Sequence, residues 1–282
     1  MNKKTVIKLV ILAIALIVVG AIGTALTGGN QGGWGRRELM QVTMGNHDVD
    51  YVTIDLTDFR VEIRQSADNQ FGLFTTAESL NMPVENGLMR ISAPHNRRNF
   101  QLINIGFNDN SDHLVLYMPN REFREVDIST RNGLIRIDDV TTQKLVVNTQ
   151  NGRVDVTNIV ANETVVQTTN GVIEATNISS NLETASTNSR IILNDIEGNI
   201  YARTTNGVID LYNETISQDV EIRTTNGAIN VNLSRMPDDA EIRATTTVGR
   251  VTLFGNNENF ATFGSGSNNV TLRTTNGRIT VQ

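Results

Sequence analysis

One short phrase returns along this chain at a nearly constant interval, and it restricts the possible folds more than any other feature. Arg-Thr-Thr-Asn-Gly occurs at 203–207, 223–227 and 273–277. Looser copies place their Asn at positions 132, 151 and 170, and degraded copies lie at 186–189 and 246–249. From position 132 to position 226, successive copies are 18 to 20 residues apart. A fixed period near this length indicates a solenoid, because paired helices and propeller blades need longer repeats.

Apolar and polar residues alternate on both sides of the Asn-Gly step. Ile209 and Leu211 follow Gly207, and Val220 and Ile222 precede the next Asn. Alternation with period two predicts strand, turn, strand. We expect the Asn-Gly step to supply residues that adopt positive φ at little cost.

The turn has two interpretations. Asn-Gly between alternating strands is a strong signal for a two-residue hairpin, and repeated hairpins would give an antiparallel meander. Alternatively, each Asn-Gly is a corner, one repeat is one coil of a β-solenoid, and equivalent strands stack in parallel. We favour the coil because whole repeats keep their register. The predicted fold is therefore an all-β solenoid with coils of roughly 19 residues and Thr-x-Asn-Gly corners.

Stacked coils bring identical side chains into columns. At a strand spacing of about 4.8 Å, Asn lies over Asn and side-chain amides can bond along the stack. The Thr two positions before each Asn falls on the inward phase, where a hydroxyl needs a partner. We expect this column to bond along the stack and to be structural. Its members are Thr149, Thr168, Thr204, Thr224 and Thr274.

The amino terminus has a different character. The run from Val6 to Leu26 is predominantly apolar, and Lys8 is its one charged residue. It is long enough to cross a bilayer as a helix. Lys3 and Lys4 precede this run, and the positive-inside rule leaves the rest of the chain outside the cytoplasm. A cleaved signal peptide is the alternative, with small-residue sites at 21–23 and 23–25. We favour an uncleaved anchor because the apolar run is long.

The organisation predicted from these patterns has four parts. Residues 1–27 are the transmembrane anchor and 28–38 a Gly-rich linker. Residues 39–125 form irregular β coils, and 126–282 form the regular repeats. The chain stops directly after a strand, so the final coil is expected to present an open edge through which a second copy can associate.

Composition argues against several kinds of chemistry. The net charge of −6 makes a nucleic-acid partner improbable. There is no cysteine, and the three histidines have no partner at ligand spacing, so we predict no thiolate or zinc site. No nucleophile elbow occurs either. We accordingly predict no catalytic residue, no cofactor and no bound metal.

The outward columns are the remaining places for a site. One series reads Arg136, Asp155, Glu174, Ile192, Asp210, Asn230. Clustered carboxylates in it could serve a carbohydrate-active enzyme or bind Ca²⁺, but only Asp155 and Glu174 occupy neighbouring coils, and a solvated face is the default.

Two groups of basic residues also face outward. Arg203, Arg223 and Arg273 are interpreted as ordinary surface charge, paired as Arg223 is with Glu221 along one strand. Arg97 and Arg98 lie in a polar loop that either is simply solvated or contacts an anionic envelope polymer or lipid headgroup.

These residues together resemble a known family. The strand end at 116–119 (Leu-Tyr-Met-Pro), the segment 126–137, the later Thr-x-Asn-Gly repeats and the apolar amino terminus resemble the bacterial putative-adhesin β-strand-repeat family, to which LiaG-like proteins of Gram-positive bacteria belong. The resemblance covers roughly residues 39–282. It implies a β-solenoid outside the cytoplasmic membrane, sometimes encoded with envelope-stress systems, and it brings no catalytic residues.

The leading hypothesis is a membrane-anchored, extracytoplasmic binding or scaffolding module of the cell envelope, with a wall polymer or an envelope protein as partner. One alternative is a regulatory partner of an envelope-stress sensor that acts through its transmembrane helix. The other is a solenoid carbohydrate-active enzyme that uses Asp155, Glu174 and Asp210.

Overall fold

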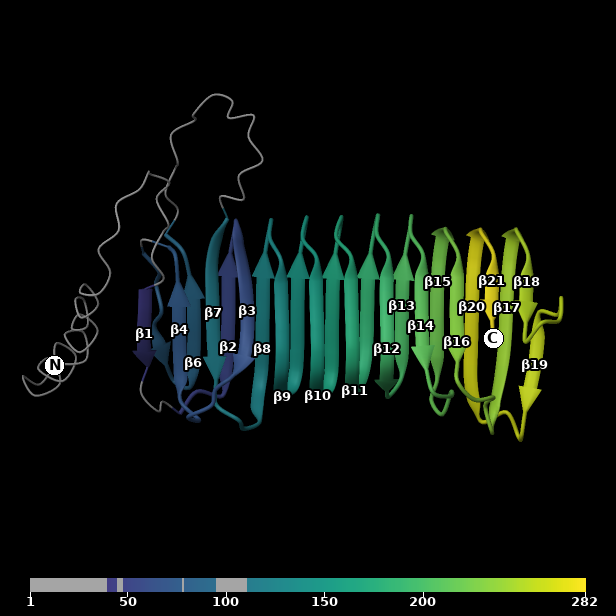
Figure 1. The fold of residues 1–282 in the computed structure, drawn as a ribbon, viewed down its shortest axis with the longest axis horizontal. Helices are drawn as coiled ribbons and strands as arrows, with labels where there is room; N and C mark the ends of the chain where they lie inside the picture. The colour runs from purple at the N-terminus through teal and green to yellow at the C-terminus, as the bar shows by residue number, and fades with distance from the viewer. Residues whose placement is uncertain (1–39, 45–47, 78, 95–110) are drawn as a thin grey trace, which may run out of the picture. The chain divides into compact units, whose positions relative to one another are not determined.

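The computed structural model describes residues 40–44, 48–77, 79–94 and 111–282. The chain divides into two units between Glu38 and Leu39, and all described residues belong to the second. They form 21 β-strands and no helix (Figure 1), which confirms the all-β prediction. Within these residues there is accordingly no helix that could cross a bilayer. The predicted anchor (1–27), the linker (28–38) and the basic loop at Arg97 and Arg98 lie outside the described residues.

The central strands stack in parallel, one coil upon the next. Val154 pairs with Ile135 on one side and with Ile173 on the other, so the register advances by one repeat per coil. This confirms the coil and excludes the antiparallel meander for the repeats. The strands of this part are β8 (Phe123–Thr130), β9 (Ile135–Thr149), β10 (Val154–Thr168), β11 (Ile173–Ser186), β12 (Ile191–Glu197), β13 (Ile200–Thr204), β14 (Ile209–Asn213), β15 (Val220–Asn226) and β16 (Ile229–Leu233).

Each coil contributes one stretch to each of two rows. We call the row that follows the Asn-Gly corner the leading sheet; it contains the first halves of β9 to β11, then β12, β14 and β16. The row that precedes the corner is the trailing sheet; it contains β8, the second halves of β9 to β11, then β13 and β15. Alternate residues of both rows are buried, and this places the core between them.

The core of the central coils is aliphatic. Between residues 135 and 231 the buried hydrophobic side chains are all Ile, Leu, Val or Ala, most of them fully inaccessible. Buried phenylalanines are confined to the amino-terminal end, where Phe71 and Phe123 meet edge to face at 6.0 Å between ring centroids. At the opposite end Phe254 and Phe263 pack in the same way at 5.2 Å. Aromatic rings therefore close the ends of the core, and branched aliphatics fill its repeating interior.

Near the amino-terminal end, the order of the coils departs from the order of the chain. β2 (Tyr51–Leu56) pairs in parallel with β6 (Leu88–Ser92) and with β8. β3 (Phe59–Gln65) pairs in parallel with β7 (Asp112–Met118) and with β9. The first coil of the body therefore lies between two later ones. The sequence predicted only irregular β coils for residues 39–125, and this order was not foreseen.

The carboxy-terminal end repeats the arrangement. β20 (Asn268–Asn276) lies between β15 and β17 (Ala240–Val248), and β21 (Ile279–Val281) lies between β16 and β18 (Val251–Leu253). The expectation that the final coil offers an open edge is therefore wrong, because both of its strands are paired on both sides. The physical reason is the Asn column: Asn276 continues it from Asn226, whereas the coil of β17 carries Val248 at that position.

Antiparallel strands lie outside the parallel stack at both ends. β4 (Phe71–Thr75) pairs with β7, β1 (Met40–Met44) pairs with β4, and β5 (Val84–Glu85) pairs with β6. At the other end β19 (Phe260–Phe263) pairs with β17 (Figure 1). Such strands cover edges that would otherwise template pairing with another chain.

Candidate functional site

The Asn-Gly corners form one continuous hydrogen-bonded column. The Nδ2 of Asn151 donates to the Oδ1 of Asn132, and each later Asn repeats the bond with its predecessor at 2.7 to 2.9 Å, as far as Asn276. Asn132 itself donates to the Oδ1 of Asp58 at 2.8 Å. The predicted ladder is confirmed, and it gives every Asn of the phrase a structural role.

The glycine of the phrase is required by space. A Cβ on Gly171 would lie 1.6 Å from the carbonyl oxygen of Gly152 in the adjacent coil, and the other corner glycines are similarly tight. The expected positive φ is absent from Gly152, Gly171, Gly207, Gly227 and Gly277. Left-handed residues occupy the opposite corner of the coil instead, at Asp139, Asn158, Asn177 and Asp195. Their spacing of 18 to 19 residues was a readable signal that our sequence analysis did not use.

The inner threonines are buried, as predicted, but they bond differently from a hydroxyl column. Thr224 Oγ1 donates to the carbonyl oxygen of Gly207 at 3.1 Å, and Thr274 Oγ1 donates to that of Gly227 at 3.0 Å. Thr168 and Thr204 donate to the preceding coil in the same way, whereas the buried hydroxyl of Thr149 has no hydrogen-bond partner among the described residues. The second and fourth positions of the phrase, like the glycine, are accounted for by stability.

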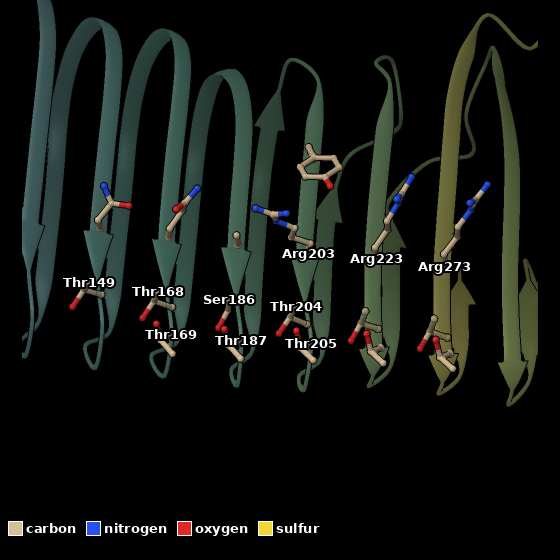
Figure 2. Close-up of a pocket in the computed structure, with 18 of the residues that line it drawn as sticks. Thr149, Thr168, Thr169, Ser186, Thr187, Arg203, Thr204, Thr205, Arg223 and Arg273 are labelled. Carbon is tan, nitrogen blue, oxygen red and sulfur yellow. The ribbon is translucent and has the colours of Figure 1, made fainter.

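The remaining two positions of the phrase face solvent on the trailing sheet. Arg203 lies opposite Arg223, and Arg223 opposite Arg273, on three adjacent strands (Figure 2). We call these three side chains the arginine row. Two residues closer to the corner is the outer threonine row, which consists of Thr169, Thr187, Thr205, Thr225 and Thr275.

Both rows line one long, open groove of about 970 Å³ over the trailing sheet. It extends from Asn148 on β9 to Thr245 on β17, across seven strands. At about 4.8 Å per strand this is a length of roughly 30 Å. Its lining contains three arginines and no acidic residue, although the whole chain carries a net charge of −6. The residues that line the groove therefore carry a positive charge, opposite in sign to the net charge of the chain.

The three arginines differ in their acidic neighbours. Arg223 forms an ion pair with Glu221. Arg203 forms a longer ion pair with Glu183, with 3.9 Å between the charged atoms. On β20, Thr271 stands opposite Glu221, and Arg273 forms no ion pair with any residue that the structure describes. The prediction of ordinary surface pairing thus holds for Arg223 and, through a longer ion pair, for Arg203, but not for Arg273 within the described residues.

The acidic series on the leading sheet does not form a reactive cluster. Asp155 lies opposite Glu174, but Ile192 separates Glu174 from Asp210. Arg153 forms ion pairs with both Asp155 and Glu174. Arg190 Nε donates to the Oδ2 of the buried Asp210 at 2.6 Å. These carboxylates are neutralised in place, and the clustered acid pair that the enzyme hypothesis needs is not formed by them. No group of three potential metal-binding side chains occurs in the described part of the chain either.

Asp127 and Asp239 have shifted pKa values, and they lie away from the groove, toward opposite ends of the stack. Burial, followed by the charges of Glu125 and Asp55, raises the pKa of Asp127. Hydrogen bonds, chiefly from the backbone and side chain of Ser267 and also from Ser265, lower the pKa of Asp239 to about 2. Asp127 lines a separate cavity of about 510 Å³ together with Glu85 and Glu125.

A parallel β-solenoid of two-stranded coils, with polar ladders at its corners and outward rows on open sheets, defines the class of this protein. The sequence matches the Toastrack DUF4097 family over residues 49–282, and the chain belongs to that family. The resemblance predicted from sequence is confirmed at this level, whereas the closer relation to LiaG-like proteins stays a prediction. No curated protein matches the chain.

Several solved structures are similar to the chain, among them the following three. A "putative adhesin" from Bacteroides fragilis is 12% identical with a TM-score of 0.49, covering 88% of this chain and 98% of that one. A "putative cell adhesion protein" from Clostridium sporogenes is 13% identical with a TM-score of 0.32, covering 86% and 98%. A "putative adhesin" from Parabacteroides merdae is 11% identical with a TM-score of 0.39, covering 86% and 96%.

Proposed function

We propose that this protein is an extracytoplasmic binding and scaffolding module of the bacterial cell envelope, held at the membrane by residues 1–27. The observation that carries the proposal is the groove of the trailing sheet, an open channel across seven strands lined by repeated side chains. Enclosed pockets suit small ligands, whereas a linear row of equivalent side chains suits a long partner that repeats along its own axis. The apolar run from Val6 to Leu26 supports the placement at a membrane.

The test uses the body of the protein, residues 39–282, which contains the whole described core. Purified cell walls and membrane vesicles are each mixed with it and sedimented. We expect retention by the walls. A variant with Thr187, Thr205 and Thr225 replaced by Glu blocks the groove with charge and bulk, and it should lose retention.

The matched control carries three Thr-to-Glu changes on the leading sheet, at Thr157, Thr252 and Thr280, whose side chains are at least partly exposed and face away from the core. It should bind like the parent. Equal losses in both variants, or no retention of the parent on walls and vesicles alike, would contradict the proposal.

The anchor is tested separately. The full chain is expected in the membrane fraction of cells, and externally added protease should degrade its body in intact cells. A version beginning at residue 39 with a cleavable export signal should leave the membrane fraction. If the body of the full chain is degraded only after the cells are lysed, it lies in the cytoplasm, and the proposed extracytoplasmic location is wrong.

A further inference from the structure

The five positions of the repeated phrase do not share the same reason for being there. Asn bonds along its column, Gly fits where no Cβ can, and the inner Thr donates to a corner carbonyl. Arg and the outer Thr have no such role. Thr205, Thr225 and Thr275 are exposed, and their hydroxyls form no hydrogen bond within the described residues. The outer Thr thus repeats without a hydrogen-bonding partner, and the Arg repeats although its ion pairs differ from coil to coil and Arg273 forms none within the described residues. Both positions line the groove.

The arginine row also has an electrostatic cost. Like charges placed directly opposite on neighbouring strands destabilise a sheet, and here three guanidinium groups follow one another at a spacing of about 4.8 Å. Glu221 and Glu183 offset part of this repulsion, but Arg273 forms no ion pair with any described residue. An anion that lies along the row would remove the repulsion and complete the charge balance.

The lining residues distinguish an anionic polymer from a neutral one. Sites for neutral sugars use aromatic faces, and Tyr201 is the one aromatic side chain in the described lining of this groove. The guanidinium group, in contrast, presents a fork of donors that matches phosphate oxygens in pairs. Threonine hydroxyls beside it can donate to a phosphate oxygen or accept from a polymer hydroxyl.

We propose that the groove binds a linear polymer joined by phosphodiester groups. Arg203, Arg223 and Arg273 contact its phosphates, and the outer threonine row contacts the units between them (Figure 2). This inference rests on the proposed function and names its ligand class. A row of equivalent sites on adjacent coils explains why the same two residues recur: each coil adds one more contact to a ligand that itself repeats.

The experiment measures binding of the body, residues 39–282, which lacks the proposed anchor and contains the whole described core, to poly(glycerol phosphate). Three other probes run in parallel: neutral dextran, polyglutamate and phosphatidylglycerol vesicles. We expect poly(glycerol phosphate) to bind best and to raise the Tm of the protein. Affinity should fall with salt, because each neutralised phosphate releases a counterion.

The decisive variant is Arg203→Gln, Arg223→Gln, Arg273→Gln. It should bind poly(glycerol phosphate) about tenfold more weakly or worse, since charge-assisted hydrogen bonds are lost. The slope of log affinity against log salt should become shallower by roughly 2, which corresponds to three phosphate contacts. Its Tm in the absence of polymer should be unchanged or raised, because the repulsion within the row is gone.

The matched control removes three other exposed arginines, Arg131, Arg250 and Arg278, and so changes the net charge by the same amount. Its affinity should stay within about twofold of the parent. Equal losses in the two variants would reduce the binding to net charge and overturn the proposal. Stronger binding to dextran, polyglutamate or the vesicles would overturn it as well, because each names a different ligand chemistry.

The same data separate this inference from the proposed function. If cell walls retain the protein but poly(glycerol phosphate) does not bind, the ligand class is wrong and the envelope role stands. If neither walls nor membranes retain it, the proposed function itself fails.

Discussion

The central coils and the two ends of the stack are built from the same kind of strand but are connected differently. From β9 to β16 each coil pairs with the next one in the sequence. At the amino-terminal end the coil β2–β3 lies between β6–β7 and β8–β9, and at the other end β20–β21 lies between β15–β16 and β17–β18. In the middle, the coils are therefore stacked in the order in which they occur in the sequence. At each end, one coil is instead inserted between two coils that are not its neighbours in that order.

This difference changes what holds each part together. A middle coil has partners 18 to 20 residues away, whereas Thr224 and Thr274 are paired across 50 residues. Long-range pairing costs more loop entropy before it is stabilised. However, neither the coil β2–β3 nor the final coil is an outer layer, so neither can unfold without uncovering a coil on each side of it. The outermost strands are short or antiparallel, and they blunt the edges.

The largest test of this comparison is truncation after Gly266, which removes β20 and β21. Val270, Leu272, Ile279 and Val281 are fully buried between two coils. Their loss should cost roughly 6–12 kcal/mol, at about 1.5–3 kcal/mol for each side chain. We expect hydrogen exchange to show loss of protection in β15 to β18, because both neighbouring coils lose a partner.

The control for that truncation replaces β19 by a flexible Gly-Ser segment of equal length. It removes an outer antiparallel strand whose side chains are largely exposed, and it should leave β15 and β16 protected. If the coils were stacked in sequence order, β20 and β21 would be at the end, and their removal would leave β15 to β18 protected. That result would contradict the inserted position of the final coil.

Much of the middle could be predicted from sequence because its information is local. The period, the alternation and the recurring Asn are all contained within one repeat, and they fix coil, register and ladder. The ends could not be read in this way, since the coils of β17 and β20 both fit beside β15 by their alternation. The one useful signal was Val248, which stands where the ladder needs Asn.

The candidate site shows a similar division. The positions and outward direction of the arginine row followed from the phrase. Its role did not, because the absence of an ion pair at Arg273 depends on which coil lies beside β15. With β17 in that place, Thr245 would have ended the row at Arg223. The return of the chain thus extends the row from two arginines to three.

A second test compares glycines in the middle and at the end. Gly171→Ala would force a Cβ against the carbonyl of Gly152 in the adjacent coil, and backbone cannot yield as a side chain can. We expect a loss of roughly 2–3 kcal/mol in the free energy of unfolding, near the upper range for overpacking.

Gly72→Ala in the antiparallel β4 is the counterpart, because its Cβ would meet only Tyr117 at 3.7 Å. This change should be neutral or should stabilise by up to about 1 kcal/mol through the unfolded chain. Urea denaturation of both variants measures the difference. Equal losses at the two sites would mean that coil-to-coil approach is not what demands glycine.

A third test compares an interior member of the Asn ladder with its last one. Asn206 donates to Asn188 and accepts from Asn226, whereas Asn276 donates to Asn226 and faces Val248. The side chains are exposed, and each such bond contributes about 0.5–1.5 kcal/mol. Asn206→Ala should therefore cost about 1–2 kcal/mol, and Asn276→Ala about half as much. Thermal unfolding of both variants measures the two losses of stability. A larger loss for Asn276→Ala would contradict the expectation that the loss follows the number of ladder hydrogen bonds.

The smallest effect concerns acid, and it should have opposite signs toward the two ends. The pKa of Asp239 is lowered to about 2, so the stability that its hydrogen bonds give is present above the ordinary carboxyl pKa near 4 and is lost as pH falls toward 2. Burial and neighbouring charge raise the pKa of Asp127, so its ionised form opposes folding at neutral pH.

Asp127→Asn should thus stabilise the protein at pH 7, by no more than about 1 kcal/mol because the site is partly solvated, and the gain should vanish near pH 3. Asp239→Asn should destabilise at pH 7 and lose its effect near pH 2. Urea midpoints across this range measure both, and two variants that shift in the same direction at pH 7 would show that the carboxyl environments at the two ends are not distinct.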